Sequence, residues 1–232
     1  MQILSFLFPL VVVFELSLAL VLRRGAFVTS VSAHGGLVRF FEIFNINVTG
    51  GLFVGGIAIV VVMLVWHLLN RDPWIVDVKV LGVMAIESLI LTAPLLMISQ
   101  LVTRAPLAAT SASAAVQVAQ LSPLAKVAIS VGAGLYEELI FRMLLIAVIH
   151  TILVDVGKAS QTLGAGIAVA VSAALFSWYH GPAALQPAVF YFLAGVYFGV
   201  IYIARGFGIV VAVHTMYDIV TILALNAGSA AQ

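Results

Sequence analysis

Long apolar runs separated by mostly short polar connectors fill almost the whole chain. A helix needs about 20 apolar residues to cross the hydrocarbon core of a bilayer, and seven segments come close to or exceed this length. They are residues 3–22, 52–69, 80–102, 127–150, 162–179, 184–204 and 207–225. The pattern predicts an all-α fold, a polytopic transmembrane helical bundle of about seven spans, with six to eight compatible with the connectors.

The connectors support one continuous membrane domain over residues 1–232. The first apolar run lacks a basic segment before it, and Arg23 and Arg24 follow where small residues would mark a cleavage site, so we expect a retained span rather than a signal peptide. Two connectors are long, 23–50 and 103–126. The second, with Pro106 and Pro123 near its ends, is expected to form a short surface helix over the bundle.

Composition agrees with a membrane protein. Of 232 residues, 64% are hydrophobic and 8% charged, with a net charge of +1, whereas soluble domains carry about 25% charged residues. This excludes a soluble enzyme, a disordered chain, a coiled coil and a nucleic-acid binder. The absence of cysteine excludes thiolate metal sites and cysteine nucleophiles. We expect a multi-pass protein of the cell membrane, or of the endoplasmic reticulum in a eukaryote.

Charged residues inside a predicted span are the most informative feature. The span 127–150 contains Glu137, Glu138 and Arg142, and each such group costs roughly 2.5–3.5 kcal/mol on insertion scales. Glu138 and Arg142 are four residues apart, so they share a helix face and can form an ion pair. Glu137 lies about 100° around the helix from Glu138. It must therefore be protonated, or meet a histidinium or a metal on another helix, and it is our first candidate for a general base.

Two other spans carry polar residues at helical spacing. Phe176 and His180 share one face at the end of the fifth span, and His214 and Asp218 share one face within the seventh. Small residues that let helices approach closely accompany them, among them Gly134 in the fourth span. The remaining histidines, His34, His67 and His150, are interpreted as structural. Glu15 and Glu87 are interpreted as solitary carboxylates, protonated and internally hydrogen-bonded.

The three pairs occur in the order Glu-Glu-x-x-x-Arg, Phe-x-x-x-His and His-x-x-x-Asp, each on its own span. This arrangement resembles the signature of the CPBP intramembrane proteases, which include the type II CAAX prenyl endopeptidases and bacteriocin-processing and immunity-associated proteins. The resemblance covers the helices of residues 127–225, which we expect to be catalytic. The first three spans contribute nothing to it.

The resemblance implies hydrolysis of a peptide bond within the membrane. In family terms, Glu137 with His180 activates a water, His214 with residue 218 stabilises the oxyanion, and Glu138 pairs with Arg142 to hold the site. The implied partners are membrane lipid and a peptide or protein substrate, either prenylated or a precursor peptide, and no nucleic acid.

Residue 218 departs from the commoner family pattern, in which it is Asn. An ionised Asp218 would repel an oxyanion, so it either orients His214 through a ring N–H or helps bind a metal. Glu137, His180 and His214 form a plausible zinc set. The chain has no H-E-x-x-H helix, and we expect no cofactor, with one divalent metal such as zinc as the alternative.

Two other functions fit the same residues. A non-catalytic binding, immunity or scaffold protein would keep the polar cluster to hold the bundle together. A proton-coupled carrier would use the carboxylates for transport, although the chain shows no internal repeat of the kind common in transporters.

Overall fold

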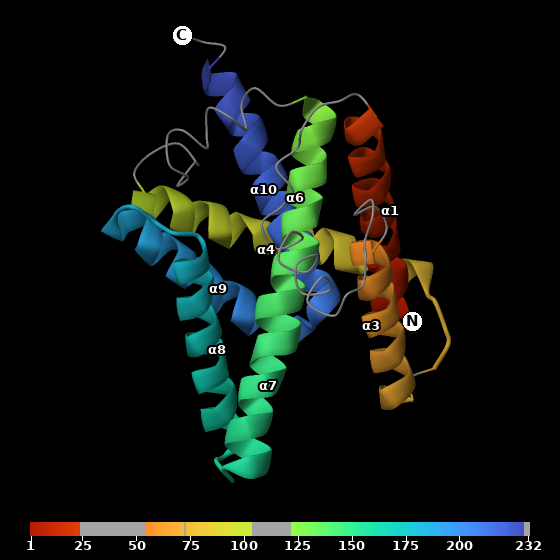
Figure 1. The fold of residues 1–232 in the computed structure, drawn as a ribbon, viewed down its shortest axis with the longest axis vertical. Coiled ribbons are helices and arrows are strands. Elements are labelled where there is room, and N and C mark those ends of the chain that lie inside the picture. The colour runs from red at the N-terminus through yellow and green to blue at the C-terminus, as the bar shows by residue number, and fades with distance from the viewer. Residues whose placement is uncertain (24–53, 72, 104–121, 230–232) are drawn as a thin grey trace.

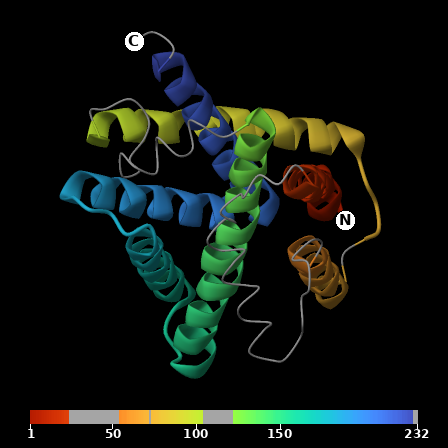
Figure 2. The same cartoon turned by 45° about the horizontal axis from the view of Figure 1, so that its top comes forward.

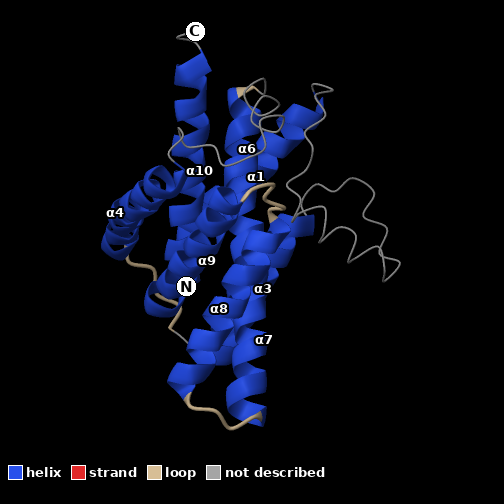
Figure 3. Ribbon diagram, turned by 90° about the vertical axis from the view of Figure 1, so that its left-hand side faces the viewer, coloured by secondary structure: helices blue, strands red, loops and turns tan. Residues whose placement is uncertain are grey.

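The computed structural model describes residues 1–23, 54–71, 73–103 and 122–229. These residues form α1 (Gln2–Arg23), α3 (Val54–Asn70), α4 (Val78–Thr103), α8 (Gln161–Tyr179), α9 (Leu185–Arg205), α10 (Phe207–Ser229), and one continuous helix composed of α6 (Pro123–Glu138), η1 (Leu139–Ile146), α7 (Ala147–His150) and η2 (Thr151–Val156). The described part of the chain contains no strand (Figure 3). The predicted all-α class is therefore confirmed.

The helices coincide with the seven predicted apolar runs to within a few residues, except that the fourth is longer. Four of them are long and apolar enough to cross a membrane, namely 78–102, 123–156, 161–179 and 185–205. The described apolar parts of α1, α3 and α10 are shorter. The chain is thus a helical membrane protein with the predicted number of about seven helices. The helix from α6 to η2 is about ten residues longer than the predicted span 127–150.

The long helix from Pro123 to Val156 organises the bundle. It runs through the molecule in Figure 1, with α8 beside its α7 half and with α1 and α10 beside its α6 half. Figure 2 shows α4 and α9 crossing it, and these two helices contact each other. The junction of α6 and η1 therefore lies where α8, α9 and α10 approach the same stretch of helix.

Small residues allow this close approach. A Cβ at Gly134 of α6 would overlap the Thr215 hydroxyl of α10 and lie 3.0 Å from the Val211 carbonyl oxygen. A Cβ at Gly195 of α9 would lie 2.8 Å from the Cα of Ala173 in α8. Both glycines are therefore required by the packing, as expected for small residues at membrane helix interfaces.

Helix ends are set by local sequence. Ser122 caps α6 by accepting a hydrogen bond from the Ala125 N–H, and Pro123 occupies the first turn, where no N–H is needed. At the end of α9, Gly206 has a φ of 86°, a conformation that glycine adopts without a Cβ clash. This single residue turns the chain from α9 into α10, and so aims α10 back toward α6.

The carboxylates of α1 and α4 lie outside the motif cluster. Glu15 is buried and accepts a hydrogen bond of 2.9 Å from the Gly56 N–H, which ties α1 to α3. Glu87 pairs with Arg205 of α9, with 2.7 Å between Oε2 and Nη2. The prediction of a solitary, protonated Glu87 is therefore wrong, because a cation 118 residues away in sequence folds back onto it.

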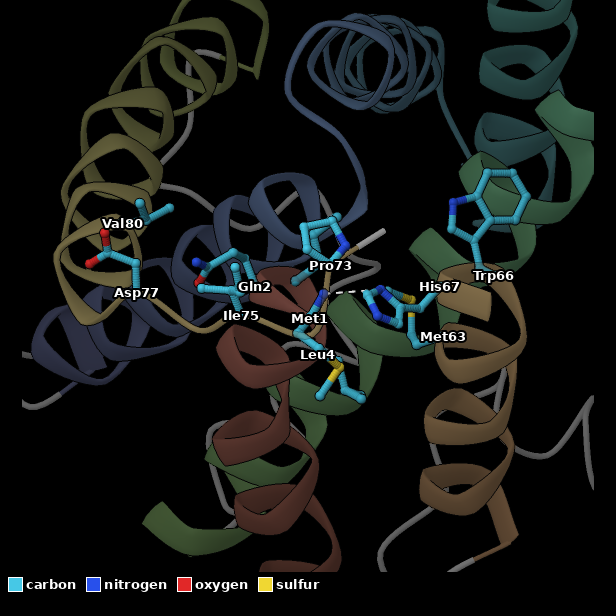
Figure 4. A pocket seen from close by; sticks show the side chains of 11 residues that line it. Met1, Gln2, Leu4, Met63, Trp66, His67, Pro73, Ile75, Asp77 and Val80 are labelled. Carbon is cyan, nitrogen blue, oxygen red and sulfur yellow. Dashed lines mark hydrogen bonds between the residues drawn. The ribbon is translucent and has the colours of Figure 1, made fainter. Parts of the chain in front are cut away.

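Some predictions fall on residues that the structure does not describe. They concern His34, nearly all of the connector 23–50 and the surface helix expected within 103–126. His67 is buried and belongs to a cavity of about 500 Å³ near the start of α1 (Figure 4). That cavity is lined by Met1, Gln2, Ile3, Leu4, Met63, Trp66, His67, Pro73, Ile75, Asp77 and Val80. None of the motif residues lines it.

Candidate active site

Residues from three parts of the chain converge where α6 continues into η1. Glu137 and Glu138 come from α6, Arg142 from η1, His180 from the end of α8, and His214 and Asp218 from α10. The side-chain contacts between them lie between 2.7 and 4.0 Å. The structure thus brings together all six residues singled out in the sequence. They fall into two groups, one of completely buried side chains and one of side chains that lie closer to the surface.

The buried part is centred on Glu138. Its Oε2 lies 3.0 Å from Nε of Arg142, and both side chains are completely buried. The predicted ion pair is therefore present. The other carboxylate oxygen, Oε1, lies 2.7 Å from Nδ1 of His214. Glu138 consequently links η1 to α10, a contact that the sequence analysis did not predict because it joins residues 76 positions apart.

Aromatic rings surround the buried arginine. The Arg142 guanidinium carbon lies 4.2 Å from the ring centroid of Phe176 and 5.1 Å from that of Phe198, distances typical of cation–π contacts. Arg142 Nη2 also donates a hydrogen bond of 3.4 Å to the Gly195 carbonyl oxygen. Phe176, the first residue of the Phe-x-x-x-His motif, therefore packs against the guanidinium of Arg142.

The backbone widens at this point of the long helix. Immediately after Glu138 the helix adopts π-helical turns over Leu139–Ile146, a feature often found at functional sites. Ser172 of α8 donates a hydrogen bond of 2.7 Å to the Phe141 carbonyl oxygen within this stretch. The apolar pattern of the sequence does not indicate the π-helical turns, because an α-helix and a π-helix bury the same types of residue.

The outward part is centred on Glu137. Its Oε2 is buried, has no direct hydrogen bond, and lies 3.6 Å from Nε2 of His180 and 4.0 Å from Nε2 of His214. These separations exceed a direct hydrogen bond and suit a bridging water. Because the Nδ1 of His180 lies 2.8 Å from the Phe176 carbonyl oxygen, which only accepts, Nδ1 carries a proton and Nε2 faces Glu137.

Asp218 occupies the edge of the site. Its Oδ2 lies 3.6 Å from Nε2 of His214, whereas the Nδ1 of that ring is held by Glu138. Side-chain exposure rises from 0% at Glu138 to 9% at Glu137, 20% at His180 and 23% at Asp218. The site therefore opens on the side of His180 and Asp218.

If all its carboxylates are ionised and both histidines are neutral, the cluster carries more negative than positive charge. The cluster contains three carboxylates and one arginine, which pairs with Glu138. Both ring nitrogens of His214 face carboxylates, Glu138 at Nδ1 and Asp218 and Glu137 at Nε2. Opposite charges at these distances stabilise the charged form of an imidazole. Each ring nitrogen of His214 therefore faces at least one carboxylate.

Two aromatic residues of α9 complete the site and were missed in the sequence. Phe198 stacks on His214 with 4.7 Å between ring centroids, and Tyr191 stacks on His180 at 4.1 Å with an interplanar angle of 23°. They are seven residues apart and share one face of α9. Their spacing is the one signal available in the sequence, but many aromatic pairs in apolar helices have it.

The alternative of a bound metal ion concerns the same side chains. Glu137, His180 and His214, the zinc ligands considered from the sequence, do face one another, yet within the described ranges no group of three His, Asp or Glu side chains is placed to hold a metal ion. The Nδ1 of His214 is occupied by Glu138. The contact between Nδ1 and Glu138 leaves Nε2 as the nitrogen of His214 that faces Glu137.

Comparison with known proteins identifies the segment that holds these residues. Residues 119–220 match the family model described as type II CAAX prenyl endopeptidase Rce1-like. No curated protein and no solved structure matches the chain. The matched segment, somewhat less than half of the chain, contains all three motifs and agrees with the resemblance to the CPBP proteases. Over residues 119–220 the chain is therefore similar to the Rce1-like type II CAAX prenyl endopeptidases, a family of membrane proteases.

Proposed function

We propose that this protein is an intramembrane endopeptidase that hydrolyses a peptide bond of a membrane-associated or lipidated peptide or protein. The observation that carries the proposal is the gap between Glu137 Oε2 and the Nε2 atoms of His180 and His214. The carboxylate and the two imidazoles are the kind of polar partners that a reactive water needs. The family match supports a CAAX-type protease.

Glu137 and His180 activate the water in this proposal. The water donates one hydrogen bond to Glu137 Oε2 and one to the lone pair of His180 Nε2. Glu137 takes up the proton as the water oxygen bonds to the scissile carbonyl carbon. When the C–N bond breaks, this proton passes to the leaving nitrogen, so that Glu137 is again ionised and the products are a carboxylic acid and an amine.

His214 stabilises the oxyanion of the tetrahedral intermediate. Its Nε2–H points into the same space as Glu137, and the carboxylate of Glu138 at Nδ1 favours the imidazolium form. A fixed donor aimed at the developing negative charge is worth far more in a water-poor site than in bulk water. Glu138 and Arg142 hold the ring in place and do not contact the substrate.

Asp218→Asn is expected to raise kcat about tenfold with little change in KM. The substitution replaces a carboxylate beside the oxyanion by an amide that can donate a hydrogen bond to it. Asp218→Ala supplies no donor and serves as the control, with kcat at least about tenfold below that of the Asn variant. Equal losses in both variants would show that the Asp218 carboxylate itself is needed.

We further propose that the reaction uses no metal. Incubation with a chelator is expected to change the cleavage rate by less than about twofold, because the water is held by side chains rather than by a Lewis acid. Elemental analysis of the purified protein accompanies the rate measurement. Stoichiometric zinc that is lost in the His180→Ala variant would overturn this proposal.

The experiment that tests the function is cleavage in reconstituted vesicles. Two peptides of the same sequence are compared, one with a prenylated cysteine near its C-terminus and one without the lipid, and products are identified by mass spectrometry. We expect cleavage by the wild-type protein, faster for the lipidated peptide, and none by His180→Ala. Equal product from His180→Ala and wild type would contradict the proposal.

A further inference from the structure

Tyr191 of α9 contacts the proposed catalytic histidine although it belongs to none of the three motifs. Its ring lies on the face of the His180 imidazole, 4.1 Å between centroids and 23° from parallel. The tyrosine is itself partly buried and packs its ring against Phe176, with centroids 6.5 Å apart and an interplanar angle of 70°. It is therefore a fixed surface against which the imidazole rests.

His180 needs such a surface because its backbone position gives it little support. The residue follows the last turn of α8 and precedes Gly181, which has a φ of 55°. One hydrogen bond, from Nδ1 to the Phe176 carbonyl oxygen, fixes the ring edge. A single hydrogen bond leaves the imidazole ring free to rotate about the line between Nδ1 and the carbonyl oxygen. That rotation would move Nε2 away from Glu137.

The contact with Tyr191 removes this freedom. Phe176 of α8 contacts the ring of His180 at 4.4 Å with an interplanar angle of 54°, and Tyr191 stacks on the face of that ring from α9. The hydrogen bond at Nδ1, the stacked ring of Tyr191 and the tilted ring of Phe176 together fix the plane of the imidazole, with Nε2 3.6 Å from Glu137 Oε2.

We propose that Tyr191 is a positioning residue that holds the His180 ring in its reactive orientation and covers it on the open side of the site. The expected effect of Tyr191 on the cleavage rate rests on the proposed function, whereas its effect on the accessibility of His180 does not. The aromatic ring provides the contact, so Tyr191→Phe keeps the role and Tyr191→Leu loses it.

The kinetic test compares these two variants with a matched control on the same helix. Tyr197 lies six residues further along α9, and its hydroxyl donates a hydrogen bond to the Leu91 carbonyl oxygen, away from the site. We expect Tyr191→Leu to lower kcat about tenfold at unchanged KM, the scale of one lost aromatic contact. Tyr191→Phe and Tyr197→Leu, each normalised to folded protein, are expected to cleave at the wild-type rate.

A second measurement needs no substrate. Diethyl pyrocarbonate modifies accessible imidazoles, and mass spectrometry reports the rate at His180, with the partly exposed His150 as internal reference. Faster modification of His180 in Tyr191→Leu alone supports the positioning role, even if no cleavage is found in any variant. Equal modification in all variants, or equal loss of kcat in Tyr191→Leu and Tyr197→Leu, would refute it.

Discussion

Glu137→Gln is expected to abolish peptide hydrolysis while leaving the helical bundle folded. Glutamine has the shape of glutamate, but its amide cannot take a proton from the water, and loss of a general base typically lowers the rate about 10²–10⁴-fold. Glu137 Oε2 has no hydrogen-bond partner that the substitution would break. The measurements are the single-turnover cleavage rate and the thermal unfolding temperature in detergent.

The matched control for this variant is Glu15→Gln. Glu15 is also a buried carboxylate, but it accepts its hydrogen bond from the Gly56 N–H between α1 and α3. It is expected to keep the wild-type cleavage rate. If Glu137→Gln retained activity at the level of Glu15→Gln, Glu137 would not be the general base and the proposed mechanism would be wrong.

Arg142→Met is expected to produce the largest loss of stability in the chain. The substitution leaves the fully buried carboxylate of Glu138 without its cation, and breaking a buried ion pair in this way costs about 3–5 kcal/mol. Methionine preserves part of the packing between Phe176 and Phe198, so the loss reports mainly on charge. Denaturant unfolding in mixed micelles, followed by circular dichroism, measures the change.

Arg205→Met provides the comparison for this loss. Arg205 pairs with Glu87, but its side chain is 53% exposed and that of Glu87 is 23% exposed, so Arg205→Met leaves no fully buried charge unpaired. A double variant, Glu138→Leu with Arg142→Met, removes both buried charges and is expected to regain part of the stability while staying inactive, since His214 loses its partner. If Arg142→Met were as stable as Arg205→Met, the buried pair would not hold the site.

The helices could be predicted from sequence because each depends on a local property. A long apolar run such as 184–204, polar only at Gln186 near its start, predicts a membrane helix from its own length, and α9 spans Leu185–Arg205. The pair Glu138–Arg142 was equally local, since four residues of helix place the two side chains on one face. The motif spacing also indicated the face on which Phe176 and His180 meet.

Contacts that depend on tertiary structure could not be predicted. The bond between Glu138 and His214 requires α10 to lie against α6, which Gly134 permits but does not dictate. The interpretation of Glu87 failed for the same reason, because Arg205 reaches it from another helix. Asp218 was expected either to orient His214 through a ring N–H or to help bind a metal. Which ring nitrogen it faces depends on the tertiary structure, since Glu138 holds Nδ1 and Asp218 lies 3.6 Å from Nε2.

The central claim is that Glu137 and His180 direct a water at a peptide carbonyl within the bundle. The most direct measurement is cleavage of a lipidated peptide by the reconstituted protein in ¹⁸O-labelled water, with mass spectrometry of both fragments. We predict one ¹⁸O atom in the new C-terminal carboxylate after a single turnover by the wild-type protein, and no product from Glu137→Gln. Absence of cleavage by the wild type on all membrane-bound peptides, or labelled product from Glu137→Gln at the wild-type rate, would contradict the claim.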